Sequence, residues 1–215
     1  MDSSAAIYSP FTLALYDTWV LKVSNNWAWQ CPTRSVLLPF FERHVRRCHL
    51  DIGVGTGYYL AKARLPEGAD ITLMDVNPAS LGAAARRIAH LSPQLLKHDA
   101  FTPLDGDQAY DSISLFYLLH CLPGPTAEKS RVFATLKHNL APDGVLFGAT
   151  ILGDAAGHNG FGKKLMAIYN RKGVFGNSDD TEEGFASELD KHFEKVELQV
   201  NGRVLLFAAS RPRIS

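Results

Sequence analysis

The stretch His49–Gly57 joins an acidic side chain to a run of glycines. Asp51 ends an apolar run, and Gly53, Gly55 and Gly57 follow it at alternate positions. Glycine lets the backbone turn sharply and lets a ligand approach without a Cβ in the way. A helix that begins directly after such a turn presents free N–H groups to a polar or anionic ligand. A carboxylate beside them suits a ligand that carries an ammonium group, whereas it would repel a pyrophosphate.

Dinucleotide-binding loops use a similar device, so the glycines alone do not choose the ligand. Tyr58 stands where a dinucleotide loop needs glycine or alanine, and this disfavours a nicotinamide-dependent reductase. The spacing of Tyr58 and Lys62 matches a reductase catalytic pair, but the pair directly follows the glycines and lies on the wrong helix. The ligand that fits best is S-adenosylmethionine, which carries an ammonium, a sulfonium and an adenosine.

Short apolar runs alternate with segments of helical spacing after about residue 46, which predicts a parallel sheet. Strands are expected at 48–52, 70–75, 94–98, 111–119 and 145–152, with helices at about 58–64, 77–91 and 126–140. Asn77 is a good N-cap and Pro78 a good first residue for the second helix. After a helix at 181–192, Asn201-Gly202 separates runs at 195–200 and 203–209 and predicts an antiparallel hairpin.

Two segments fall outside this alternation. Residues 1–45 contain all three tryptophans and are expected to form a separate aromatic-rich cap of two short helices, ahead of the main domain at 46–215. Residues 153–180 contain six glycines and no clear strand, with a helical stretch at about 163–169. Irregular segments of this length inside a compact domain are often functional, so a lid is expected there.

Five motifs resemble, in order, those of class I S-adenosylmethionine-dependent methyltransferases. Leu50–Gly57 is similar to the first motif of that family, and Asp75-Val76-Asn77-Pro78 to its acidic second motif. Three later stretches complete the resemblance: His98-Asp99-Ala100, Tyr110 to Pro123, and Leu140 to Leu146. The matches cover about residues 48–150 and are most similar to the compact small-molecule branch, which includes quinone-biosynthesis enzymes.

The resemblance implies a single Rossmann-like doubly wound α/β sheet of seven strands, mostly parallel with a C-terminal antiparallel hairpin. It also implies that Asp75 accepts hydrogen bonds from both ribose hydroxyls and that Asp99 takes the adenine amino group. The cofactor-binding residues expected from it are Asp51, Gly53, Gly55, Gly57, Asp75, Val76, Asp99, Ala100, Leu115 and Phe116. The cofactor would be S-adenosyl-L-methionine and its product S-adenosyl-L-homocysteine.

A catalytic side chain is optional in methyl transfer, because alignment of donor and acceptor can supply much of the rate. A base is needed mainly for a hydroxyl or a protonated amine. His120 is the expected base, since it follows the fourth strand at the carboxyl edge of the sheet. Tyr16 and Asp17 in the cap are further catalytic candidates. No metal site is expected, because His44 and Cys48 lack metal-ligand spacing.

The balance of charges restricts the partner. Lys and Arg number 22 and Asp and Glu number 22, so the formal net charge is +0 and few phosphates could be neutralised. We therefore expect methylation of a small apolar or aromatic molecule in secondary metabolism. The alternatives are a non-methylating enzyme that binds the same cofactor and, less favoured, a nucleic-acid methyltransferase. Three scattered cysteines, an acidic N-terminus and the lack of a long apolar run predict a cytoplasmic protein without a membrane span, monomeric or homodimeric.

Overall fold

A single seven-stranded sheet organises the computed structural model, which describes residues 18–104, 106 and 108–213. The strand order is β3-β2-β1-β4-β5-β7-β6. The strands are β1 (Cys48–Ile52), β2 (Asp70–Asp75), β3 (Gln94–Lys97), β4 (Tyr110–Phe116), β5 (Leu140–Ile151), β6 (Phe193–Asn201) and β7 (Val204–Pro212). The first five strands pair in parallel with one another, and β7 is antiparallel to both β5 and β6. The predicted doubly wound sheet with its terminal hairpin is therefore confirmed.

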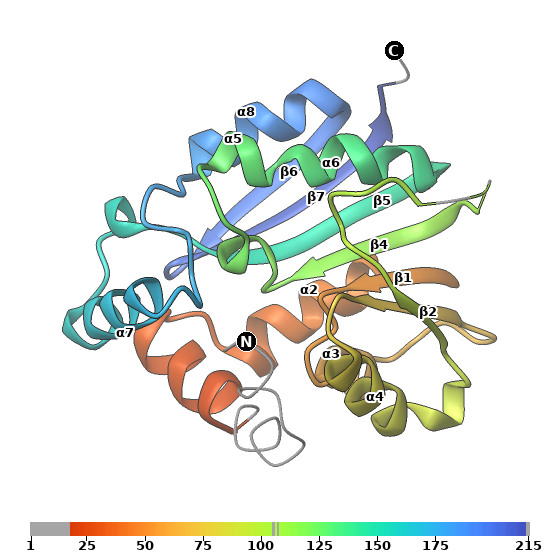
Figure 1. Ribbon diagram of the computed structural model, residues 1–215, viewed down its shortest axis with the longest axis horizontal. Helices are drawn as coiled ribbons and strands as arrows, with labels where there is room; N and C mark the ends of the chain where they lie inside the picture. Colours follow the sequence, from red (N-terminus) through yellow and green to blue (C-terminus); the bar gives the residue numbers. More distant parts are fainter. Residues whose placement is uncertain (1–17, 105, 107, 214–215) are drawn as a thin grey trace.

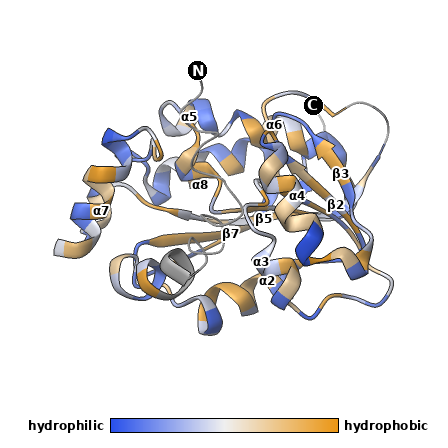
Figure 2. Cartoon of the chain, turned by 60° about the horizontal axis from the view of Figure 1, so that its bottom comes forward, coloured by the Kyte–Doolittle hydropathy of each residue, from blue (hydrophilic) through white to orange (hydrophobic). Residues whose placement is uncertain are grey.

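Helices cover both faces of this sheet (Figure 1). One face carries α2 (Leu38–His44), α3 (Tyr58–Lys62), α4 (Pro78–Arg87) and η4 (Ala89–Leu91). The other carries α5 (Thr126–Lys129), α6 (Arg131–Leu136), η6 (Lys137–Asn139) and α8 (Glu182–His192). Each face has its own apolar core, one around Phe41 and Phe147 and the other around Phe133 and Phe207. Figure 2 shows hydrophobic residues of β5 and β7 at the centre, between these layers.

Side-chain caps explain where two of the helices begin. The Asn77 side chain accepts a hydrogen bond from the N–H of Ala79 at 2.9 Å, and Pro78 is the first residue of α4. Thr181 does the same for α8 by accepting from the N–H of Gly184 at 3.0 Å. Each cap satisfies a backbone donor that has no partner within its helix. The predicted start of α4 is confirmed.

Three predicted boundaries are wrong for local reasons. The fourth strand ends at Phe116 instead of residue 119, because Tyr117 adopts φ +60° and leaves the extended conformation before η5 (Leu119–Cys121). The helix expected at 126–140 is interrupted at Ser130, where an i to i+3 hydrogen bond tightens the chain. The fifth strand begins at Leu140 instead of residue 145, because β5 already pairs with β4 at Leu140 and absorbs the extra residues as a register shift.

The described part of the N-terminal segment is helical, and two of its helical pieces precede α2. They are η2 (Thr18–Ala28), which is a π-helix, and η3 (Thr33–Leu37), which continues into α2. Between them, the carbonyls of Trp29 and Gln30 lie 2.3 Å from where a Cβ on Gly202 would stand. The hairpin turn therefore needs glycine at this position, and the N–H of Arg203 donates to the Trp29 carbonyl at 2.7 Å.

The segment predicted as a lid contains η7 (Asp154–Ala156) and α7 (Gly160–Arg171), a helix longer than the stretch expected at 163–169. Helix α7 packs against η2, and both lie at one end of the sheet (Figure 1). Asn159 caps α7 by accepting from the N–H of Gly162 at 2.7 Å, and its amide donates to the Trp27 carbonyl at 2.7 Å. The N-terminal segment and the predicted lid are thus in direct contact.

Candidate active site

The carboxyl ends of β1, β2 and β4 meet at one edge of the sheet, because these strands are parallel neighbours. Asp51 lies near the end of β1 and Asp75 ends β2. The glycine loop, residues 53–57, follows β1 directly, and η5 follows β4. Open α/β sheets bind ligands at such an edge, where the strand order reverses between β1 and β4. The predicted motifs are therefore brought together by the topology.

Two glycines of the glycine loop have different roles. At Gly57, where φ is +69°, a Cβ would stand 3.0 Å from the Cβ of Ala84 on α4. At Gly55, where φ is +51°, a Cβ would meet no atom within 4 Å. Gly57 therefore lets the loop pack on the helix behind it. Gly55 faces open space, so that a ligand can approach the backbone there.

Asp75 faces the glycine loop. Its Oδ1 accepts from the N–H of Asn77 at 2.8 Å, and the N–H groups of Val54 and Gly55 also stabilise its charged form. Burial nevertheless raises the pKa of this carboxyl above its usual value. The next side chain, Val76, is 59% exposed and is one of the few exposed large apolar residues in the described part of the chain. A polar anchor and an apolar contact therefore lie side by side at this edge.

Asp51 is almost completely buried beside the glycine loop. Burial raises the pKa of its carboxyl, a hydrogen bond from the Ser114 hydroxyl at 2.5 Å opposes this rise, and the nearby Asp75 adds to it, so that the pKa lies at about 7. Two neighbouring carboxylates whose charged forms are disfavoured gain stability when a cation binds between or beside them. This arrangement fits a ligand with an ammonium group, as the sequence predicted.

The remaining predicted cofactor residues differ in exposure. Asp99 is exposed, and its Oδ1 accepts from the N–H of Phe101 at 3.0 Å in a tight turn after β3. Ala100 is buried next to it. Leu115 and Phe116 point to opposite faces of β4, where both are buried in the two apolar cores. Contact of these four residues with the cofactor stays a prediction.

His120 lies in η5 and is 2% exposed. Its ring stands 5.4 Å from the ring of Tyr117 and 4.6 Å from that of Phe175. The backbone N–H of Ile151 donates to Nδ1 at 3.4 Å. Burial, together with the positive charge of Lys129, lowers the pKa of the imidazole to about 3. His120 is therefore a neutral ring, and its proton is on Nε2 when Nδ1 accepts.

Phe175 connects His120 to the segments that the sequence predicted as cap and lid. Its ring lies 4.8 Å from Tyr169 of α7 and 6.1 Å from Trp29 of the N-terminal segment. We call these five rings, from Trp29, Tyr117, His120, Tyr169 and Phe175, the aromatic cluster. Phe175 was not predicted as a functional residue from the sequence. The local signal for it is a bulky side chain between Gly173 and Gly176. Tyr16 and Asp17 lie outside the described residues.

Comparisons with known proteins agree with this geometry. A family profile described as a methyltransferase domain, Methyltransf_12, matches residues 50–146. The chain is 42% identical over 215 residues to a physcion biosynthesis cluster O-methyltransferase of Aspergillus chevalieri, covering 99% of this chain and 97% of that one. It is 51% identical over 193 residues to the protein YbcY of Escherichia coli K12, covering 87% and 97%. The chain belongs to this methyltransferase family.

The fold of a solved relative agrees with the assignment. The N-methyltransferase NodS of Bradyrhizobium japonicum, in complex with S-adenosyl-L-homocysteine, superposes with a TM-score of 0.59 at 18% identity. The match covers 82% of this chain and 85% of that one. The protein is thus an S-adenosylmethionine-dependent methyltransferase, and its carboxylate pair and open glycine loop fit that cofactor.

The end of the predicted lid is tied to the body of the methyltransferase. The Lys129 ammonium donates to Asp180 at 2.9 Å and to the Gly176 carbonyl at 2.7 Å, and both charged side chains are buried. The N–H of Gly176 donates to the carbonyl of His120 at 2.9 Å, and the amide of Asn177 donates to the carbonyl of Ile151 at 2.9 Å. These bonds hold Phe175 over η5.

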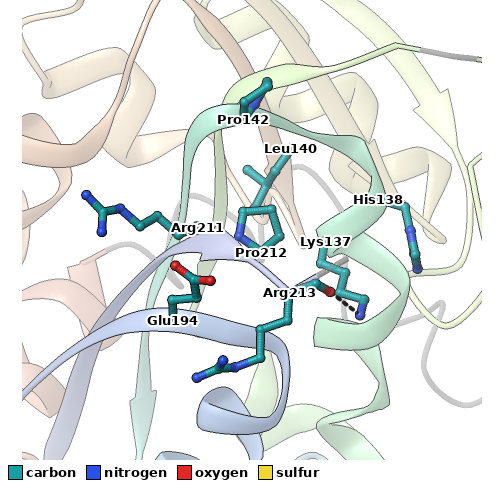
Figure 3. Close-up of a pocket in the computed structure, with 8 residues that line it drawn as sticks. All are labelled: Lys137, His138, Leu140, Pro142, Glu194, Arg211, Pro212 and Arg213. Carbon is teal, nitrogen blue, oxygen red and sulfur yellow. Dashed lines mark hydrogen bonds between the residues drawn. The ribbon is translucent and has the colours of Figure 1, made fainter. Parts of the chain in front are cut away.

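A separate hollow of about 340 Å³ lies at the opposite end of β5 (Figure 3). Its lining residues are Lys137, His138, Leu140, Pro142, Glu194, Arg211, Pro212 and Arg213. The Lys137 ammonium donates to the carbonyl of Arg213 at 2.8 Å, the bond drawn as a dashed line in Figure 3. Because the hollow lies at the amino end of β5, it is remote from the glycine loop.

Within the part of the chain that the structure describes, no group of three or more His, Cys, Asp or Glu residues is arranged to hold a metal ion. No helix within residues 18–213 is both long and apolar enough to cross a membrane.

Proposed function

We propose that the enzyme methylates a small aromatic or apolar metabolite, which binds at the aromatic cluster beside the cofactor. The aromatic cluster is the observation that supports this substrate class, since five rings from four separate segments gather next to the carboxyl end of β4. Aromatic rings favour flat apolar partners by stacking and edge contacts. The similar Aspergillus chevalieri protein, named for physcion biosynthesis, supports a secondary metabolite.

We assign the cofactor's functional groups to residues as follows. Asp51 binds the ammonium group, Asp75 the ribose hydroxyls and Asp99 the adenine amino group, while Val76 and Ala100 contact the adenine ring. When bound, S-adenosylmethionine supplies a methyl group on a sulfonium centre and leaves as S-adenosylhomocysteine. The glycine loop contributes close backbone approach at Gly55.

The protein's part in the chemistry is alignment and exclusion of water. Phe175, held by the Lys129–Asp180 pair, covers the acceptor side, and burial there strengthens every polar interaction with the substrate. Holding the acceptor atom in line can supply up to roughly 7–11 kcal/mol of the barrier reduction. The net charge of +0 agrees with a small neutral acceptor. The cytoplasmic location, the monomeric or homodimeric state and the absence of a nucleic-acid substrate stay predictions.

His120 orients the acceptor in this proposal. Because its Nδ1 accepts from the backbone of Ile151, its Nε2–H is a donor that can bind an acceptor oxygen or nitrogen. A pKa of about 3 makes the ring a weak proton acceptor, so His120 could act as the base expected from the sequence only after a change in its buried environment.

The function is tested by incubating the enzyme with methyl-labelled S-adenosylmethionine and a panel of hydroxylated and aminated aromatic compounds. Labelled product and S-adenosylhomocysteine should form together. Cofactor binding without any S-adenosylhomocysteine across the panel would favour the non-methylating alternative. Transfer of label to nucleic acid but to none of the small molecules would overturn the proposal.

The role of His120 is tested with two variants. His120→Gln keeps a side-chain donor, so turnover should stay close to that of the wild type. His120→Phe removes the donor, and turnover should fall by about 2- to 10-fold, the cost of losing a hydrogen bond between neutral groups of roughly 0.5–1.5 kcal/mol. Calorimetry should show unchanged cofactor affinity in both. Equal, severe losses would instead identify His120 as a base, and full activity of His120→Phe would exclude either role.

A further inference from the structure

A chain of polar side chains runs through the sheet behind Asp51. In the parallel pairing of β1 with β4, His49 stands opposite Ser112 and Asp51 opposite Ser114. Residues two apart on a strand point to the same face, so all four side chains share one face. His49, Ser112 and Ser114 are 0% exposed and Asp51 is 7% exposed. Buried polar groups of this kind are costly unless each finds a partner.

The distances along this chain allow every group a partner. The backbone N–H of Arg46 donates to the Ser112 hydroxyl at 2.9 Å, and that oxygen lies 2.8 Å from Nδ1 of His49. Nε2 of His49 lies 3.2 Å from the Ser114 hydroxyl, which donates to Oδ1 of Asp51 at 2.5 Å. The chain thus starts at a backbone donor and ends at a carboxylate.

The number of available protons determines the direction of the hydrogen bonds in this chain of side chains. A serine hydroxyl has one proton, so Ser114, which donates to Asp51, must accept from Nε2–H of His49. Burial lowers the pKa of His49 to about 3, so the ring is neutral and Nδ1 carries no proton. Nδ1 therefore accepts from Ser112, which in turn accepts from Arg46. Every bond points toward Asp51, and such chains strengthen one another.

We propose that His49 and Ser114 are positioning residues that hold the Asp51 carboxylate ready for the ammonium group of S-adenosylmethionine. The proposal rests on the function proposed above, in which Asp51 binds that group. The rings of Phe41 and Phe147 lie 5.8 and 5.9 Å from the His49 ring and keep its orientation fixed. Packing alone does not require a polar ring in this core, where burying one is costly. The histidine therefore serves the carboxylate in addition to the packing.

The charged surroundings of Asp51 decide the sign of the pH dependence. Asp75 on β2 disfavours its ionised form, and Ser114 favours it. On α2, which packs over this face, Glu42 accepts from the N–H of Arg64, His44 bonds to the carbonyl of Phe40, and Arg43 is exposed. On α3, Lys62 is exposed. Loss of the Ser114 hydroxyl, which donates to the Asp51 carboxylate, therefore raises the pKa of Asp51. Tight binding of the cofactor then requires a higher pH.

The experiment measures S-adenosylhomocysteine binding by calorimetry between pH 5.5 and 8.5 (about the range that brackets a carboxyl shifted toward neutrality). Wild-type affinity should rise as pH passes through about 7, where Asp51 ionises. In Ser114→Ala this rise should move upward by about one pH unit, the equivalent of one hydrogen bond to a charged group. His49→Phe should move it in the same direction, and His49→Gln, which keeps a donor, should move it less.

Two measurements exclude a merely structural effect. Ser130→Ala removes another buried serine hydroxyl, between α5 and α6 on the opposite face, and should leave the pH midpoint unchanged. In the wild type, nitrogen NMR should show His49 as the neutral Nε2–H tautomer and carbon NMR should follow the Asp51 carboxyl directly. Both NMR observations are made on the wild-type protein, so they test the proposal even if a variant fails to fold.

The outcomes separate the two proposals. Failure of the wild type to bind S-adenosylhomocysteine at any pH would refute the proposed cofactor site. Normal wild-type binding with an unmoved midpoint in Ser114→Ala, or a His49 proton on Nδ1, would overturn the positioning role alone.

Discussion

The two halves of the candidate active site are built in different ways. The cofactor side consists of Asp51, the glycine loop and Asp75, which lie within 25 residues of one another on β1 and β2. The acceptor side is the aromatic cluster, whose members extend from Trp29 to Phe175. The glycine loop of the cofactor side is held by backbone bonds such as that from Gly53 N–H to the Met74 carbonyl at 2.9 Å. The acceptor side depends more on side-chain bonds over long sequence distances, such as those from Lys129 to Asp180 and to the Gly176 carbonyl.

This difference matches what each half must recognise. A cofactor of constant structure can be bound by a short, nearly local arrangement of backbone and carboxylates. An acceptor that differs among relatives, as the names of similar O- and N-methyltransferases indicate, needs a site whose side chains can be exchanged. Side chains on separate segments can change without disturbing the sheet. The following three predictions test that contrast.

The largest effect is expected at the buried ion pair of the acceptor side. Lys129→Met leaves the Asp180 carboxylate buried without its partner, and the free energy of unfolding should fall by about 3–5 kcal/mol. Urea denaturation would measure it. Lys191→Met breaks the exposed pair with Glu188 and should cost less than about 0.5 kcal/mol. A Lys129→Met protein as stable as the wild type would show that side chains do not hold this half.

An intermediate effect is expected at Asp75. Asp75→Asn removes a charged acceptor, so cofactor affinity should fall by roughly 1.5–3 kcal/mol, or about 10- to 100-fold, with stability little changed. Calorimetry with S-adenosylhomocysteine provides the measurement. Asp70→Asn, at the opposite end of the same strand, is the matched control and should bind normally. Equal affinities of the two variants would remove Asp75 from the cofactor side.

The smallest effect is expected at Phe175. Phe175→Ala removes one ring from the aromatic cluster, and the KM for an aromatic acceptor should rise by about 2- to 10-fold, the equivalent of one aromatic contact. Cofactor affinity should not change. Phe161→Ala, at a more exposed position of α7, serves as the control. If Phe175→Ala weakened the cofactor and left the acceptor unaffected, the division into two sides would be wrong.

The sequence anticipated the cofactor side better than the acceptor side. Asp51 and Asp75 were predicted because each lies in a short motif next to its strand, and the structure places both at the same edge. His49 was missed as a partner of Asp51, although its position two residues earlier puts it on the same face. Ser112 and Ser114 alternate with apolar residues in β4, and this alternation was a similar signal of polar partners for Asp51.

The order of elements, the two helix caps and the closing hairpin follow from short-range patterns, so the amino-acid sequence alone determined the fold class and the cofactor loop. The meeting of Phe175 with Trp29 and His120, and the burial of Lys129 against Asp180, depend on segments that are distant in the chain. No local pattern specifies such contacts, because their stability comes from desolvation and packing that exist only after the chain has folded. The same holds for the direction of the hydrogen bonds that lead to Asp51.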